Sequence, residues 1–368
     1  MQRSFRGIVR RLPRRPVLAC VVLTAALGLV PTTALALGGT GLSPWSSKLS
    51  LPSGKLSLPG GGLSLGRTGL SSGMYAGGGG SLRYQLYVPS TYRSAGVLGR
   101  GGGTSMPLVV ALHGCVQTAD VFRQQTRWDQ VAERNGFIVV FPEQSKSANY
   151  LSCWNFFQPT DTQRGSGEPA EIAGLTQSIM RRYSIAAHRV YVAGFSAGAA
   201  MASVMAATYP DLFSAVGVGS GCEYDASAAC AGFKGIDPQV AGRNAFQAMG
   251  SQARVMPFIV FHGDADTTVP PVNASQVVQQ WLLTDDMADD GSANGSIPRS
   301  PVSSGTGAGP GRTYTMTSWA NARGGSLGQL FMVHGMKHAW SGGCACQSYT
   351  DPAGPDETSK MWAFFAVH

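Results

Sequence analysis

Four serines of this chain lie in the pattern Gly-x-Ser-x-Gly, in which a serine hydroxyl can be presented as a nucleophile: Ser64, Ser71, Ser196 and Ser326. Because the chain holds 49 glycines in 368 residues, so short a pattern also arises by chance. Only Ser196 stands between a β-branched stretch at 190–192 and an alanine-rich, helix-forming run at 197–207. This strand-turn-helix context predicts that Ser196 is a nucleophile, and the alternative is a Gly-Ser turn without chemistry.

A serine hydroxyl needs a base to take its proton and a third group to orient that base. The stretch "PFIVFHGDADTTVPP" places Asp264 and Asp266 after an apolar run, and "QLFMVHGMKHAWSGG" places His334 and His338 after the next one. We choose Asp266 and His338, because they lie in loops that would overhang the serine. His262 and His334 belong to the ends of the strands themselves.

The carbonyl oxygen of a substrate becomes negative during acyl transfer and needs fixed hydrogen-bond donors. The stretch "LHGCVQ" ends an apolar run upstream of the serine, where a loop with such donors is expected. We predict that the backbone amides of Cys115 and Ala197 form this oxyanion hole, and that Gly114 lets the chain approach closely. The alternative is a simple turn at the end of a strand.

Eight short apolar runs alternate with longer helical patterns from residue 81 onward, which is typical of a mostly parallel sheet covered by helices on both faces. The sequence therefore predicts one α/β domain over residues 81–368. Residues 37–80 are rich in Gly, Ser and Leu and hold no acidic residue, so we predict a flexible linker.

Residues 1–36 have the composition of a secretory signal peptide, with six arginines in the first fifteen residues and then an apolar run. That run is shorter than the roughly 20 residues of a membrane-spanning helix, so we expect no stable membrane anchor. A retained anchor and lipidation at Cys20 are the alternatives. We expect a secreted or periplasmic protein.

The formal charge of +8 arises mostly from the N-terminal region. Residues 1–80 hold nine basic and no acidic side chains, which leaves 19 − 20 = −1 for residues 81–368. A nucleic-acid partner therefore has no electrostatic basis in the predicted domain.

Six cysteines remain after the predicted signal peptide, an even number that favours disulfides in an oxidising compartment. We predict Cys222 with Cys230 first and Cys115 with Cys153 second. Cys344 and Cys346 are too close in sequence to pair comfortably.

The stretches "LHGCVQTADVF", "CWNFF", "RVYVAGFSAGAAM", "FHGDADTTVPP" and "KHAWSGG" occur in this order. With them, residues 81–368 resemble the catalytic domain of extracellular short-chain polyhydroxyalkanoate depolymerases and their related esterases. The resemblance implies an α/β-hydrolase fold and a Ser196, His338 and Asp266 triad that acts without metal or cofactor. It also implies the Cys115 backbone as an oxyanion donor and poly-3-hydroxybutyrate or its oligomers as the ester substrate.

Other functions stay open at this point. No polymer-binding domain follows the catalytic motifs, so a feruloyl or acetylxylan-type carbohydrate esterase is the first alternative. A catalytically silent binding protein of the same fold is the second. We expect Trp154 and Trp340 to line the substrate cleft, since ester pockets are mostly apolar, and we expect a monomer.

Overall fold

The computed structural model describes residues 68–93, 105–233 and 235–368. The predicted signal peptide at 1–36 and the first part of the predicted linker lie outside the described residues.

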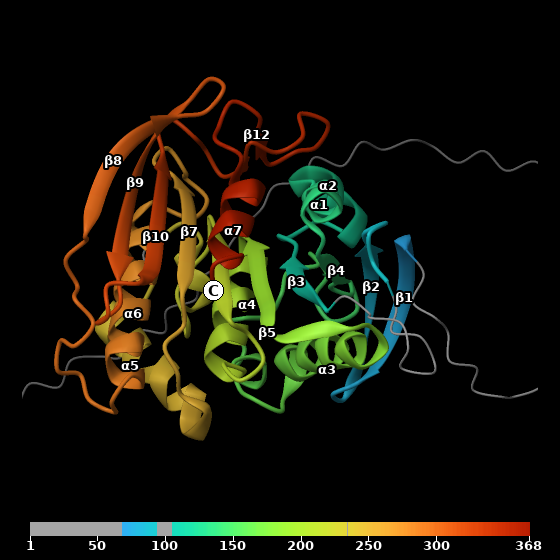
Figure 1. Cartoon of the computed structure of the whole chain (residues 1–368), viewed down its shortest axis with the longest axis horizontal. Helices are drawn as coiled ribbons and strands as arrows, with labels where there is room; N and C mark the ends of the chain where they lie inside the picture. Colours follow the sequence, from blue (N-terminus) through green and yellow to red (C-terminus); the bar gives the residue numbers. More distant parts are fainter. Residues whose placement is uncertain (1–67, 94–104, 234) are drawn as a thin grey trace, which may run out of the picture. The chain divides into compact units, whose positions relative to one another are not determined.

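Within this part of the chain, ten strands form one sheet in the spatial order β1-β2-β4-β3-β5-β6-β7-β10-β9-β8 (Figure 1). The strands are β1 (Gly69–Gly77), β2 (Gly80–Val88), β3 (Met106–Leu112), β4 (Ile138–Glu143), β5 (Ile185–Phe195), β6 (Ala215–Gly219), β7 (Phe258–Gly263), β8 (Ser303–Ala308), β9 (Thr313–Ala320) and β10 (Ser326–Val333). A separate pair consists of β11 (Trp340–Ser341) and β12 (Thr350–Asp351).

Seven α-helices and three short 3-10 turns connect the strands of the described residues. The helices are α1 (Ala119–Thr126), α2 (Trp128–Asn135), α3 (Gly167–Arg182), α4 (Ala197–Thr208), α5 (Pro238–Met249), α6 (Val272–Ala288) and α7 (Glu357–Phe365). The turns are η1 (Pro159–Asp161), η2 (Ala228–Cys230) and η3 (Gly250–Gln252).

The centre of the sheet is parallel, from β4 through β3, β5, β6 and β7 to β10, and antiparallel strands complete both edges. Central strands are apolar because both of their faces are covered. In β3, Leu108 and Val110 pack on the side of α3 to α6, whereas Val109 and Ala111 pack on the side of α1, α2 and α7. Figure 1 shows these two helical layers on opposite faces of the sheet. The predicted α/β architecture is confirmed.

The prediction of a flexible linker over residues 37–80 is wrong for residues 69–77. They form the edge strand β1, which pairs with β2 from Gly69 opposite Val88 to Gly77 opposite Gly80. The backbone ladder stabilises this Gly- and Ser-rich strand although its own side chains bury little surface. The ordered sheet therefore begins about a dozen residues earlier than its apolar content predicts.

None of the helices in the described residues has the length and apolar character needed to cross a membrane.

Candidate active site

Ser196 is the single residue between β5 and α4. Its backbone has φ 55° and ψ −123°, a conformation that costs a non-glycine residue roughly 1–3 kcal/mol. The Ser196 amide donates to the Gly219 carbonyl at the end of β6 over 2.9 Å, so the neighbouring strand holds the strained turn in place. The turn leaves Ser196 partly exposed, whereas its neighbours Phe195 and Ala197 are buried.

Both glycines of the serine motif are needed because backbone atoms approach them closely. A Cβ atom on Gly194 would lie 2.1 Å from the Gly198 carbonyl oxygen, and one on Gly198 would lie 2.2 Å from the Leu112 carbonyl oxygen. Atoms this close would overlap. The start of α4 can therefore pack directly against the ends of β5 and β3 only with glycine at these two positions.

Ser196, His338 and Asp266 form a hydrogen-bonded row from three different loops. His338 Nε2 lies 2.9 Å from Ser196 Oγ, and His338 Nδ1 lies 2.7 Å from Asp266 Oδ2. Asp266 follows β7 and His338 follows β10, the strand next to β7 in the sheet. The structure thus brings together the three residues that the sequence selected.

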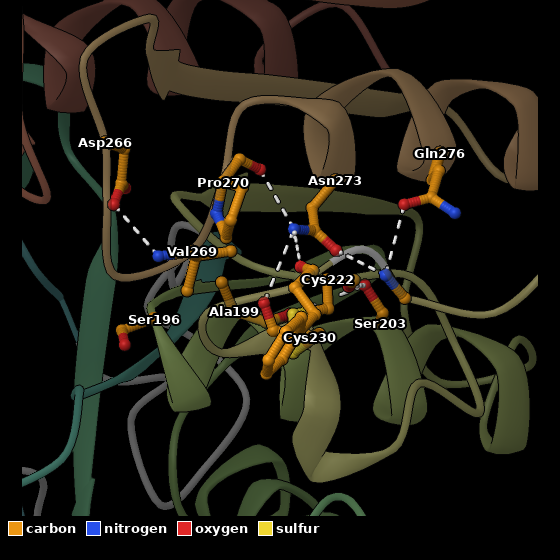
Figure 2. Close-up of a disulfide and its surroundings, with 12 residues drawn as sticks. Ser196, Ala199, Ser203, Cys222, Cys230, Asp266, Val269, Pro270, Asn273 and Gln276 are labelled. Atoms are coloured by element: carbon orange, nitrogen blue, oxygen red, sulfur yellow. Dashed lines mark hydrogen bonds between the residues drawn. A yellow bond between two sulfur atoms is a disulfide. The ribbon is translucent and has the colours of Figure 1, made fainter.

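The carboxylate of Asp266 is buried and held by two backbone amides. Thr268 and Val269 each donate to Asp266 Oδ1 over 2.9 Å, and Figure 2 shows the Val269 contact. Burial by itself raises the pKa of Asp266, but hydrogen bonds from His338 and Val269 and the charge of His338 outweigh it and leave the pKa below its ordinary value. Asp266 is therefore ionised at neutral pH, and its carboxylate orients the His338 ring through Nδ1.

His262 and the Cys222–Cys230 disulfide loop support the turn that carries Asp266. His262 is fully buried, burial lowers its pKa, and its Nε2–H donates to the Val269 carbonyl over 2.8 Å. The Gly232 amide, two residues after Cys230 of this disulfide, donates to the Thr268 carbonyl over 2.7 Å. Figure 2 shows this loop beside Asp266 and Ser196. Neither support was expected at the site from the residue pattern alone.

Asp264 and His334, the alternatives for the acid and the base, pair with each other. His334 Nδ1 lies 2.9 Å from Asp264 Oδ2, and both side chains are about 40% exposed. His334 Nε2 meets the Thr315 hydroxyl at 3.0 Å instead of Ser196. This second pair ties together the two loops that carry Asp266 and His338.

The loop after β3 lies against the serine. A Cβ atom on Gly114 would come within 3.3 Å of Ser196 Cβ and 2.9 Å of the Phe195 ring, so the loop backbone touches the turn. Among the described residues, no acceptor takes the backbone amide of Cys115 or Ala197. These two amides, predicted as oxyanion donors, are therefore available to a ligand.

His113 fixes the orientation of the peptide between Gly114 and Cys115. The His113 ring is fully buried, and burial lowers its pKa to about 4, so it is neutral at pH 7. Its Nε2 accepts from the Gln144 amide at 3.0 Å, which leaves the ring proton on Nδ1, 2.7 Å from the Gly114 carbonyl. Because the C=O and N–H of a planar trans peptide point in opposite directions, this contact directs the Cys115 amide to the other side of the loop.

Gln117 and the Cys115–Cys153 disulfide hold the same loop from other sides. The Gly114 amide donates to Gln117 Oε1 over 2.9 Å, and the Trp154 indole donates to the His113 carbonyl over 3.1 Å. The stretch "LHGCVQ" predicts only the backbone donor of the oxyanion hole. Its two polar side chains, His113 and Gln117, are the signal in the sequence for the support of this loop.

Trp154 and Trp340 are fully buried, so the prediction that they line the substrate cleft is wrong. Trp340 donates to the Thr358 hydroxyl over 3.0 Å and packs edge-on against Phe122. Trp154 packs beside His113 with ring centroids 5.5 Å apart. Both side chains pack in the core beneath the site. They can be buried there because each indole N–H has a polar partner inside the core.

The two predicted disulfides, Cys222–Cys230 and Cys115–Cys153, are confirmed. Cys344 and Cys346 are also joined, which corrects the expectation that they are too close to pair. Their Cα atoms are 5.1 Å apart, within the usual range for a disulfide, because the chain turns between them.

No group of three or more His, Cys, Asp or Glu side chains in the described residues is arranged to hold a metal ion.

Comparison with known proteins gives matches over most of this domain. The family described as Esterase PHB depolymerase matches residues 82–297. Poly(3-hydroxyalkanoate) depolymerase C of Paucimonas lemoignei is 35% identical over 251 residues, which cover 65% of this chain and 58% of that protein. Acetylxylan esterase A of Talaromyces purpureogenus is 32% identical over 279 residues, which cover 70% of this chain and 66% of that protein. The chain thus spans less than two thirds of the length of either relative.

A solved structure of an acetyl xylan esterase from Aspergillus awamori has a similar fold, with a TM-score of 0.61 and 23% sequence identity. The match covers 81% of this chain and 100% of that one. It supports the α/β-hydrolase fold of the described domain.

Proposed function

Because the chain belongs to the Esterase PHB depolymerase family, we propose that it is a serine carboxylic-ester hydrolase that uses Ser196, His338 and Asp266 as its catalytic residues. The observation that carries this proposal is the hydrogen-bonded row of these three side chains beside the unbonded amides of Cys115 and Ala197.

The reaction follows from the geometry. Ser196 Oγ attacks the ester carbonyl while His338 Nε2 takes its proton, and the ionised Asp266 stabilises the resulting imidazolium. The amides of Cys115 and Ala197 stabilise the negative oxygen, and each such donor is worth about 10²- to 10³-fold in rate. His338 then protonates the leaving alcohol. Water, deprotonated by His338, releases the acid from the acyl-enzyme.

We take short-chain polyhydroxyalkanoate, poly-3-hydroxybutyrate or its oligomers, as the substrate class. The depolymerase relative supports this choice. The second candidate is an acetyl or feruloyl ester of xylan, which the acetylxylan esterase relative supports. We also infer that the protein works in an oxidising compartment, secreted or periplasmic, because three disulfides join its described cysteines.

The triad is tested by labelling the purified protein with a fluorophosphonate probe. The parent should label, and Ser196→Ala should not label and should lose about 10⁶-fold in kcat. Ser326→Ala is the matched control, since Ser326 has the same motif but begins strand β10. A folded parent that does not label would favour the silent binding protein.

The substrate is tested by measuring hydrolysis of 3-hydroxybutyrate oligomers, amorphous polymer, acetylated xylan and feruloylated xylan. Activity on the hydroxybutyrate compounds is the expected result. Activity confined to the xylan esters would replace the first substrate class with the second.

A further inference from the structure

A cavity of about 450 Å³ opens at the carboxyl end of β4. Its wall combines residues of β1, β2, the end of β4, the loop after β3 and the loop after β4: Met74, Ser81, Arg83, Thr118, Glu143, Gln144, Ser145, Lys146, Ser147 and Ser152. Most of these side chains are polar. The mechanism proposed above uses none of them.

The position of the cavity relates it to the candidate active site. β4 neighbours β3, and β3 neighbours β5, which ends beside Ser196. All three strands are parallel, so their carboxyl ends lie along one edge of the sheet. Two interstrand spacings of about 4.8 Å place the end of β4 about 10 Å from the end of β5. In sheets of this type, ligands bind along this edge.

Direct contacts connect the cavity wall to the loop at 113–118 after β3, which carries Cys115 and is called the oxyanion loop. The Gln144 amide donates to His113 Nε2 over 3.0 Å. Ser152 precedes Cys153, whose Cα lies 4.2 Å from that of Cys115. Since consecutive Cα atoms are about 3.8 Å apart, Ser152 lies within about 8 Å of the Cys115 Cα. One wall of the cavity is therefore part of the structure that positions the Cys115 amide.

The charges in the cavity favour an anion. Arg83 and Lys146 are exposed, and among the described residues neither has a hydrogen-bond or ion-pair partner. The single acidic side chain, Glu143, accepts from the Ala119 amide over 3.0 Å and lies across the strand pair from Arg83. Two unpaired cations against one engaged carboxylate leave a positive site. An arginine guanidinium matches the two oxygens of a carboxylate.

We propose that this cavity is a subsite for a carboxylate carried by the ester substrate, with Arg83 and Lys146 as its ligands. The inference rests on the proposed esterase function and adds to it a preference for acidic substrates. Arg83 lies on β2, one strand beyond β4, so three interstrand spacings, about 14 Å, separate it from β5. Two substrate classes offer a carboxylate at about this distance from an ester bond. One is the free carboxyl end of a hydroxyalkanoate oligomer, and the other is a uronate substituent on xylan. The serine hydroxyls of the wall can form hydrogen bonds with the oxygen-rich chain of either substrate.

Binding to the Ser196→Ala variant tests the subsite apart from turnover. Isothermal titration compares the 3-hydroxybutyrate trimer with its methyl ester, in which a methyl group caps the carboxylate and removes its charge. A second arm compares a xylo-oligosaccharide that carries glucuronate with the neutral one of equal length. We expect the acidic member of one pair to bind about five- to tenfold more tightly, an advantage that falls as salt concentration rises. The pair that shows it identifies the source of the carboxylate.

Arg83→Gln combined with Lys146→Gln, in the same background, should bring the ratio of acid to neutral affinity close to one. Arg323→Gln is a control for the loss of a single surface charge, because it removes one positive charge in the turn between β9 and β10, in the half of the sheet away from β2. It should keep the parental ratio. Equal affinities in both arms, no binding of any of the four compounds, or a ratio that the double variant leaves unchanged would overturn the subsite. If the parent hydrolyses none of these esters but the binding preference is present, the result would instead count against the esterase assignment.

Discussion

Two substitutions of His113 distinguish its contact with the oxyanion loop from its contribution to the stability of the core. Its Nδ1–H binds the Gly114 carbonyl at 2.7 Å, and its Nε2 accepts from the Gln144 amide at 3.0 Å. His113→Leu removes both contacts. His113→Asn keeps a side-chain N–H near the position of Nδ1 and removes only the acceptor for Gln144. The two variants therefore share one loss and differ in the other.

The shared loss should cost both variants stability. It leaves the buried backbone N–H of Gln144 without an acceptor, which should lower the free energy of unfolding by about 1–3 kcal/mol. The difference should appear in catalysis. With His113→Leu the peptide between Gly114 and Cys115 is free to rotate, and losing one oxyanion donor costs about 10²- to 10³-fold in kcat. His113→Asn should stay within about tenfold of the parent.

The assay is steady-state hydrolysis of a p-nitrophenyl ester, with thermal unfolding to confirm that both variants are folded at the assay temperature. We expect the loss in kcat for His113→Leu with KM within about threefold of the parent, because the oxyanion forms only in the transition state. Equal kcat values for the two folded variants would refute the orienting role of His113. So would a parental kcat for His113→Leu.

Three further predictions concern the same site. Because burial depresses the pKa of His113 from 6.5 to about 4, the unfolded chain takes up this proton first on acidification, so the parent should lose about 3 kcal/mol of stability between pH 6.5 and 4. Urea unfolding should show a smaller loss in His113→Asn, and an equal loss would contradict it. Gly198→Ala should cost about 1–3 kcal/mol and abolish fluorophosphonate labelling, whereas Gly305→Ala, with open space around its Cβ, should do neither. Asp266→Asn should lower kcat about 10⁴-fold and Asp264→Asn less than tenfold; similar losses would mean that the exposed pair also acts in catalysis.

The sequence identified the three central side chains because each follows a strand, and strand ends are where parallel sheets gather polar groups. Ser71 shows why the serine motif alone is insufficient. It has the flanking glycines but lies within β1, where its hydroxyl meets the Leu86 carbonyl at 3.4 Å. Because no turn into a helix follows Ser71, its hydroxyl is not exposed by a strained backbone and no helix amide lies beside it.

The edge strand β1 and the two tryptophans were mispredicted for related physical reasons. β1 is stabilised by backbone hydrogen bonds to β2 and by Tyr75, which packs against Gly174 of α3. Neither contribution is visible in the composition of a Gly- and Ser-rich segment. Trp154 and Trp340 lie close in sequence to site residues, but proximity along the chain does not determine which side of the backbone a side chain takes. Both point into the core, where their indole N–H groups find acceptors.

Two Asp–His pairs lie on the same two loops, and their different burial explains why only one of them is suited to acid–base chemistry. The side chains of Asp266 and His338 are 0% and 8% exposed, whereas those of Asp264 and His334 are 40% and 41% exposed. In water, the attraction between a carboxylate and an imidazolium is heavily screened, so the outer pair mainly holds the loops together. Around the inner pair water is excluded, and the same charges would interact more strongly in the proposed step in which His338 takes a proton. Residue order along the chain narrows the choice to these four side chains, but only packing on the turn at 266–269 decides which pair can support a reaction at Ser196.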